Sequence, residues 1–296
     1  MDKISNNTHK SFSDKWNKNP DLAFKSTLDS SSEINSWILN RNGFSDIEKF
    51  GTYLKDKKRV LDGGCGNGRI TALLRLNTPP TSEIVGIDFS SHDIAAQNLT
   101  QYSNVSIYQK DLLEDLSELG QFDFIYCQEV LHHTSDPELG FKNLVDILSK
   151  EGEIAIYVYK KKAPIREFTD DQVRREISPM GYEEAMTECR NITHLGKTLS
   201  DIDVKIDVPK INSLQIEAGC YTIQRFIYHF FMKCFWNNDL TFEENAVINY
   251  DWYHPQLCSR HTLKEVRSWF EENDLNILHE CVDYYGITVR GKKKMK

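Results

Sequence analysis

The chain of 296 residues is long enough for one large α/β domain, or for one domain with a sizeable insertion. Its formal net charge of −8 argues against nucleic acid as a partner, because proteins that grip nucleic acids usually carry a basic face. The seven cysteines form no C-x-x-C pair, which indicates reduced thiols in a cytoplasmic enzyme. No apolar stretch is long enough to span a bilayer, so we expect no membrane partner.

The first 57 residues predict a helical leader. Apolar residues recur at helical spacing over residues 32–41 and again over residues 47–54. The first twenty residues are polar, with Phe12 and Trp16 as their only large anchors. We therefore expect one or two helices before the first strand.

Residues 59–73 read R-V-L-D-G-G-C-G-N-G-R-I-T-A-L and predict a ligand-binding turn. A short apolar run ends at Asp62, glycines follow, and an apolar helical pattern begins at Ile70. A strand that passes through glycine into a helix brings bare backbone to a ligand at the helix N-terminus. The dinucleotide fingerprint requires a glycine at the position of Arg69, so the spacing argues against a nicotinamide cofactor.

Strand and helix patterns then alternate along residues 58–159. Apolar runs at residues 84–88, 105–109, 122–127 and 153–159 are separated by segments of helical length. Asp88 ends the first of these runs, and Asp111 follows the second. The alternation predicts a doubly wound parallel sheet with right-handed crossovers.

The alternation stops at residues 160–260, which predict a largely helical inserted lid or substrate-binding region. Residues 250–255 crowd aromatic and polar side chains into a stretch that ends in Pro255, which we interpret as a loop. Residues 261–296 then return to the main domain with one helix, for which Thr262 is a plausible N-cap, and a closing β-hairpin.

The glycine loop, with Asp88 and Asp111 in series, resembles the class I S-adenosylmethionine-dependent methyltransferases of the small-molecule type. The resemblance implies a Rossmann-like, doubly wound seven-stranded sheet whose last strand is antiparallel, and S-adenosyl-L-methionine as the cofactor. It implies that the leader folds over the cofactor, although for Trp16 simple packing against the sheet stays open. The residues that it implies for cofactor binding are Asp62, Gly64, Cys65, Gly66, Gly68, Asp88, Phe89, Asp111, Leu112, Gln128 and Glu129.

The residue types suit these roles. A carboxylate such as Asp88 presents two acceptor oxygens to the two hydroxyls of a ribose, while Asp111 would accept from the adenine amino group. The cofactor brings its own leaving group, so the protein has to position the acceptor and exclude water.

Residues outside the cofactor site are assigned from their chemistry. His133 follows the strand at residues 122–127 and is the best candidate base, although a structural role stays open. Tyr253 and His254 are the candidate catalytic residues of the insertion, with Asp251 as an anchor for a cationic substrate. Trp252 would contact substrate, and Arg260 and His261 would bind an anionic group or cap the next helix. We expect no metal, although the residue types of Asp251, His254, Cys258 and His261 would suit zinc.

The sequence thus predicts a methyltransferase that acts on a small-molecule metabolite. An RNA or protein methyltransferase with the same cofactor stays open, as does, less favoured, an NAD-dependent oxidoreductase. The residues do not identify the substrate, the methylated element or the oligomeric state.

Overall fold

A computed structural model describes residues 3–294. They divide into two compact units, which we describe separately. The larger unit comprises Trp16–Lys160 and Ser259–Lys296 up to residue 294, and the smaller comprises residues 3–15 and Lys161–Cys258. The expected leader is therefore not one element, because residues 3–15 group with the insertion and the rest with the sheet. No helix in the described part of the chain is long and apolar enough to cross a membrane.

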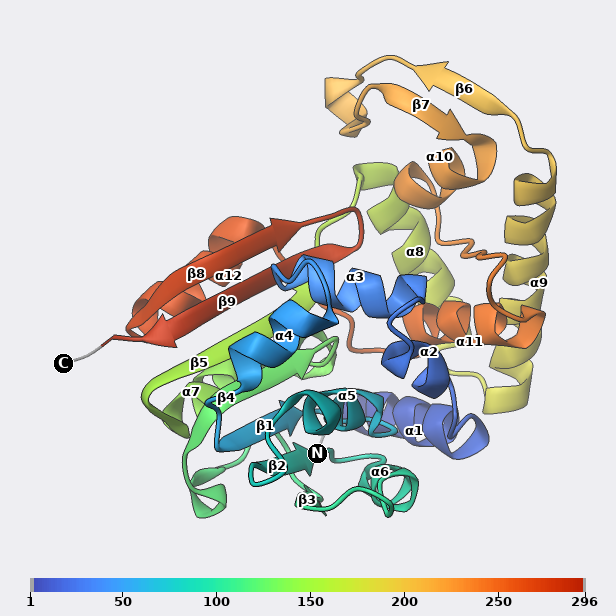
Figure 1. Ribbon diagram of the computed structural model, residues 1–296. Helices are drawn as coiled ribbons and strands as arrows, with labels where there is room; N and C mark the ends of the chain where they lie inside the picture. Colours follow the sequence, from blue (N-terminus) through green and yellow to red (C-terminus); the bar gives the residue numbers. More distant parts are fainter. Residues whose placement is uncertain (1–2, 295–296) are drawn as a thin grey trace. The chain divides into compact units, whose positions relative to one another are not determined.

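The larger unit is built on a seven-stranded sheet in the order β3-β2-β1-β4-β5-β9-β8 (Figure 1). Its strands are β1 (Arg59–Gly63), β2 (Glu83–Ile87), β3 (Val105–Tyr108), β4 (Phe122–Gln128), β5 (Leu148–Tyr159), β8 (Leu275–Val282) and β9 (Gly286–Lys293). The first five strands are mutually parallel, and β9 is antiparallel to both β5 and β8. This confirms the predicted Rossmann-like fold with its antiparallel closing hairpin.

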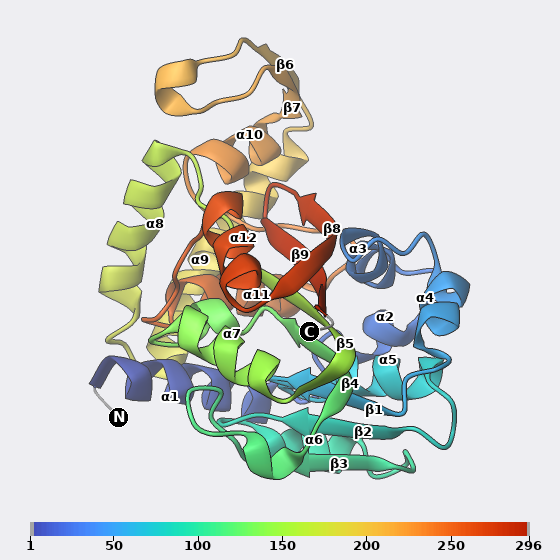
Figure 2. The same cartoon turned by 90° about the vertical axis from the view of Figure 1, so that its left-hand side faces the viewer.

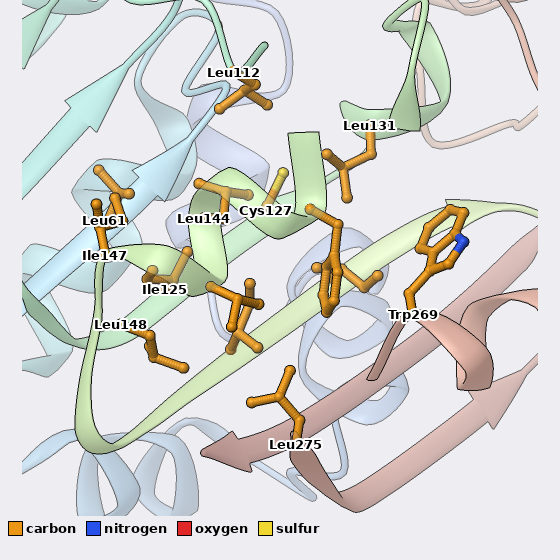
Figure 3. Packing of buried hydrophobic residues seen from close by; sticks show 14 of the residues in the cluster. Leu61, Leu112, Ile125, Cys127, Leu131, Leu144, Ile147, Leu148, Trp269 and Leu275 are labelled. Carbon is orange, nitrogen blue, oxygen red and sulfur yellow. The ribbon is translucent and has the colours of Figure 1, made fainter. Parts of the chain in front are cut away.

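Helices cover both faces of the sheet (Figure 2). One face packs against α7 (Pro137–Asp146) and α12 (Leu263–Glu272), and Figure 3 shows side chains such as Leu144 and Trp269 in this apolar layer. The other face packs against α3 (Glu33–Arg41), α4 (Ile47–Leu54) and α5 (Arg69–Asn77). The remaining short elements are α2 (Phe24–Leu28), α6 (His92–Asn98), η1 (Ser117–Leu119) and η2 (Leu131–His133). Burial of apolar area on both faces stabilises the sheet.

The parallel register brings the carboxyl ends of the strands to one edge. Gly63 lies opposite Ile87, Ile87 lies opposite Tyr108, and Gln128 lies opposite Tyr157. Segments that leave these ends are separated by tens of residues in sequence but are neighbours at this edge. Open α/β sheets bind ligands here.

The smaller unit is largely helical and carries one two-stranded hairpin. Its elements are residues 3–15 of α1 (Lys3–Lys18), α8 (Pro164–Ile177), α9 (Tyr182–Asp201), β6 (Lys205–Val208), η3 (Asn212–Leu214), β7 (Gly219–Thr222), α10 (Ile223–Phe230) and α11 (Phe242–Tyr253). Residues 3–15 pack in this unit partly through Asn7, whose amide donates to the Ser178 carbonyl oxygen at 2.7 Å.

The interpretation of residues 250–255 as a loop is wrong, because α11 continues to Tyr253. A capping box between Thr241 and Glu244 begins this helix by satisfying the first backbone N–H groups. His254 caps its end, and Pro255, which cannot continue a helix, terminates it.

Candidate functional site

The turn after β1 has a backbone that only glycine adopts easily. Gly64, Gly66 and Gly68 have φ values of 81°, 57° and 87°, in the left-handed region. A Cβ on Gly64 would lie 2.4 Å from Cγ2 of Val130, which follows β4. A Cβ on Gly66 would lie 3.0 Å from Cζ2 of Trp16, so the indole of this leader residue lies against the loop. The three glycines are therefore required for a close approach.

Asp88 joins this turn to the end of β2. Its Oδ2 accepts the Gly66 N–H at 3.0 Å. Its Oδ1 accepts the N–H groups of Ser90 and Ser91 at 2.8 Å and the Ser91 hydroxyl at 3.0 Å. Since a carboxylate oxygen accepts two hydrogen bonds readily, Oδ2 keeps acceptor capacity for a ligand.

Two side chains of the loop point into the protein instead of towards its surface. Asp62 is only 2% exposed and accepts the Thr71 hydroxyl at 2.6 Å, and burial raises its pKa to about 7. Cys65 packs with Ala72 and Ala95, and burial raises the pKa of its thiol well above the ordinary value. For Cys65, only the backbone is positioned to meet a ligand.

The residues after β2 and β3 have local hydrogen bonds that shape their turns. Asp111 Oδ1 accepts the Leu113 N–H at 2.9 Å, and the Leu112 carbonyl accepts the Asn143 amide at 2.9 Å. The Phe89 carbonyl accepts the Gln109 amide at 3.1 Å. Both turns therefore lie at the same sheet edge as Asp88, with defined conformations.

Gln128 ends β4 with an unsatisfied buried atom. Its Nε2 donates to the Ala155 carbonyl oxygen at 3.3 Å, while its Oε1 is buried without a hydrogen-bond partner in the described structure. A buried acceptor of this kind is costly unless a ligand or water supplies a donor. The ammonium of a methionyl group has the required chemistry.

Glu129 has a φ of 65° and is held by two arginines that the sequence analysis did not select. Its carboxylate lies 3.3 Å from Arg69 Nη2 and 3.7 Å from Arg41 Nη1. The buried Arg41 guanidinium lies 3.8 Å from the ring centroid of Trp37 and 4.2 Å from that of Tyr157. The spacing of Trp37 and Arg41, four residues apart on a predicted helix, is the signal that could have revealed this pair.

His133 lies in η2, directly after β4, and is buried. Its ring meets Tyr159 edge-on, with centroids 5.5 Å apart. The neighbouring His132 stacks on Tyr159 at 3.7 Å, and its Nδ1 lies 3.3 Å from the Tyr159 N–H nitrogen. The two histidines therefore have different surroundings, as adjacent residues of a short helix should.

The predicted substrate residues are divided between the units. Arg260 and His261 belong to the larger unit, in which the His261 N–H donates to the Tyr159 carbonyl at 2.8 Å. His261 Nε2 also lies 2.9 Å from the Ser259 hydroxyl. The remaining four, Asp251 to His254, belong to the smaller unit.

Tyr253 and His254 have internal partners that do not favour the catalytic roles predicted for them. The Tyr253 hydroxyl lies 2.9 Å from both Asp170 Oδ1 and the Lys233 carbonyl oxygen, and burial raises its pKa well above the ordinary value. His254 Nδ1 lies 2.7 Å from the Ser11 hydroxyl, Nε2 lies 3.0 Å from the Met180 carbonyl oxygen, and burial lowers its pKa. These contacts stabilise the smaller unit, and we do not assign either residue a proton-transfer role.

Asp251 and Trp252 also have partners within the protein. Asp251 pairs with Lys15 at 2.7 Å, so its charge is offset by the protein itself and not by a substrate cation. The Trp252 indole N–H donates to Asp170 at 2.9 Å. Within residues 3–294, no group of three or more His, Cys, Asp or Glu side chains is close enough to hold an ion.

The sheet order and the glycine turn define a class I methyltransferase fold. A family model described as a methyltransferase domain matches residues 54–223, more than half of the chain, and the chain therefore belongs to this family. By family, the chain is therefore a methyltransferase.

Similar proteins match parts of the chain. It is 30% identical over 123 residues to juvenile hormone acid O-methyltransferase of Bombyx mori, covering 39% of this chain and 44% of that protein. It is 31% identical over 150 residues to tRNA U34 carboxymethyltransferase of Sulfurimonas denitrificans, covering 48% and 45%. It is 38% identical over 84 residues to ubiquinone biosynthesis O-methyltransferase of Pseudomonas syringae pv. tomato, covering 27% and 35%.

The aligned regions span less than half the length of these relatives. Among solved structures, PKMT2 from Rickettsia typhi has a TM-score of 0.54 at 14% identity, covering 84% of this chain and 54% of that one. At this identity, the likeness concerns the fold alone.

Proposed function

We propose that this protein transfers the methyl group of S-adenosylmethionine to a small-molecule metabolite. The observation that carries the proposal is the Gly66 N–H to Asp88 hydrogen bond, which joins the glycine turn and the acid after β2 at the binding edge of the sheet. The names of the Bombyx mori and Pseudomonas syringae relatives, juvenile hormone acid O-methyltransferase and ubiquinone biosynthesis O-methyltransferase, support the substrate class.

In this proposal, the turn and the strand ends hold the cofactor. Gly64, Gly66 and Gly68, with the backbone of Cys65, would admit its methionyl part, and the buried Oε1 of Gln128 would accept from its ammonium. Asp88 would accept from the ribose hydroxyls with Phe89 beside the adenine, and Asp111 and Leu112 would meet the adenine edge. Asp62 and Glu129 would contribute to cofactor binding through their charges and through the shape of the turns in which they lie.

The cofactor supplies an activated methyl group with its own leaving group. The chain has to hold the acceptor atom in line with that group, about 3–3.5 Å away, and to exclude water. His133 would remove a proton if the acceptor is a hydroxyl or an amine, because a neutral imidazole nitrogen can act as a general base. Arg260 and His261 remain candidates for substrate contact on the larger unit.

Binding of S-adenosylhomocysteine, measured by calorimetry, tests the cofactor site. Asp88→Ala should lower the affinity by about 10–100-fold, because it removes charge-assisted hydrogen bonds worth about 1.5–3 kcal/mol. Asp123→Ala is the matched control, since Asp123 also accepts two backbone N–H groups, those of Lys58 and Arg59 at the start of β1. Equal losses in both variants would contradict the assignment, and stabilisation by NAD instead would favour the oxidoreductase.

The substrate class is tested with methyl-labelled cofactor. The protein and the cofactor are added to a cell extract separated into small molecules, RNA and protein, and the labelled compound is identified. We expect the label in the small-molecule fraction, and expect His133→Gln to lower turnover while retaining cofactor affinity. Label in RNA would instead favour the alternative suggested by the name of the Sulfurimonas denitrificans relative.

A further inference from the structure

Trp252 in the smaller unit is surrounded by cations of the same unit. The charged groups lie 4.9 to 5.6 Å from its ring centroid, and they belong to Lys162, Arg166, Arg174 and Lys233. Each of these four residues is less than 9% exposed. Buried cations are costly unless anions offset their charge, so the carboxylates near this ring decide how well the four cations are stabilised.

The carboxylates of this region are each committed to other cations. Asp170 pairs with Arg166 at 2.9 Å and also accepts from Trp252 and Tyr253. Asp171 pairs with Arg174 Nη1 at 2.7 Å, and Asp251 pairs with Lys15 at 2.7 Å. None of these ion pairs includes Lys233.

Lys233 therefore has no direct ion pair in the described part of the chain. The residue is 6% exposed, and within residues 3–294 no carboxylate or hydrogen-bond acceptor partners its ammonium; the Trp252 ring lies 4.9 Å away. Burial lowers its pKa to about 8, although the carboxylates of Asp251 and Asp170 act in the opposite direction from a longer distance. Its position is fixed, because its backbone N–H donates to Asp170 at 2.9 Å.

Arg174 presents a second unsatisfied donor in the same cluster. Its Nε is buried without a partner in the described structure, although Nη1 and Nη2 are occupied. Nη2 also lies 3.3 Å from the Cys258 sulfur. Both cations thus lie beside the Trp252 ring, with the charged group of Lys233 4.9 Å and that of Arg174 5.6 Å from its centroid.

We propose that Lys233 and Arg174, beside Trp252, form a binding site for one oxyanion group, a carboxylate or a phosphate, of the small-molecule substrate. An oxyanion accepts from both an ammonium and a guanidinium N–H, and would satisfy the two donors together. The assignment of this oxyanion group to the substrate rests on the proposed function. The site reverses the sequence-based hypothesis in which Asp251 anchors a substrate cation.

Inorganic phosphate and acetate are the probes, with sodium chloride at equal ionic strength as the reference. Either probe should raise the melting temperature of the full chain above the chloride reference, and calorimetry should give a dissociation constant. A response to phosphate alone identifies a phosphate site, and a response to acetate identifies a carboxylate site. No response to either probe would overturn the proposal.

Lys233→Met should weaken probe binding at least tenfold. Lys197→Met is the matched control, because the Lys197 ammonium also lies near a tryptophan ring, 5.6 Å from the centroid of Trp236, but Lys197 is half-exposed and paired with Asp201. Arg174→Lys, which keeps the charge but lacks Nε, is a second variant in case Lys233→Met folds poorly, and should also weaken binding. Unchanged binding in a folded Lys233→Met or Arg174→Lys protein would contradict the site.

Two further measurements separate the alternatives. Cys258→Ser tests whether the Cys258 sulfur occupies the place of the proposed oxyanion. Probe binding that appears only in this variant would show that it does, and would overturn the proposal. S-adenosylhomocysteine binding is measured on the same samples. Cofactor binding without a probe response overturns the oxyanion site alone, whereas a probe response without cofactor binding overturns the proposed function alone.

Discussion

The glycine turn of the larger unit and the Trp252 cluster of the smaller unit offer different groups to a ligand. The Trp252 cluster comprises Trp252 and the four cations around it, Lys162, Arg166, Arg174 and Lys233. The turn uses backbone, through the positive φ angles of Gly64, Gly66 and Gly68 and their N–H groups. The cluster uses side chains instead: the Trp252 ring comes from α11, Arg174 comes from α8, and Lys233 lies in the segment between α10 and α11. Backbone sites are recognisable in a short stretch of sequence, whereas sites assembled from distant charges are not.

The largest effect should come from Asp170→Asn in the smaller unit. This change leaves Arg166 buried without its counter-charge, and breaking such a pair costs about 3–5 kcal/mol. Urea denaturation should show this loss in the free energy of unfolding, without a matching loss of cofactor affinity in protein that remains folded. Asp171→Asn, which changes a half-exposed partner of Arg174, is the control and should cost less than about 1 kcal/mol.

Gly64→Ala should disturb the larger unit instead. The new methyl group would lie 2.4 Å from Val130 in a left-handed backbone, so we expect a loss of about 2–4 kcal/mol and at least tenfold weaker cofactor binding. Gly181→Ala is the control, because nothing lies within 4 Å of its added Cβ and its φ of −71° is ordinary. Intact cofactor binding in Gly64→Ala would remove the turn from the proposed site.

The two regions should also respond to pH with opposite sign. Asp62 has its pKa raised from 3.8 to about 7 by burial, so between these values the folded protein holds a proton that the unfolded chain has lost. The free energy of unfolding therefore falls as pH rises from about 4 to 7, by at most about 1.4 kcal/mol per pH unit from this group. His254 has its pKa lowered below 6.5, so its contribution to stability is lost as pH falls below that value.

Urea denaturation between pH 4.5 and 8 distinguishes these contributions. Asp62→Asn should flatten the decline towards pH 7, and His254→Gln should flatten the loss of stability below pH 6.5. Identical pH profiles for the wild type and Asp62→Asn would show that this carboxyl does not hold the extra proton. Identical pH profiles for the wild type and His254→Gln would show that the His254 imidazole does not cause the loss of stability below pH 6.5.

Much of the fold could be predicted because its signals are local. Short apolar runs separated by helical segments predict parallel strands, and glycines after Asp62 predict a tight turn at a strand end. The β8–β9 hairpin was predicted as well and is present. Residues 250–255 were interpreted wrongly, because their composition resembles a binding loop while the capping box at Thr241 extends a helix through them.

The sequence by itself determined the sheet and the family, because the residues responsible follow one another along the strand ends. Only the tertiary structure decided the partners of the insertion: it paired Asp251 with Lys15, buried Tyr253 against Asp170, and left Lys233 unpaired beside Trp252. The physical reason is that charge balance depends on distances between side chains from separate helices, which no spacing along the chain reveals.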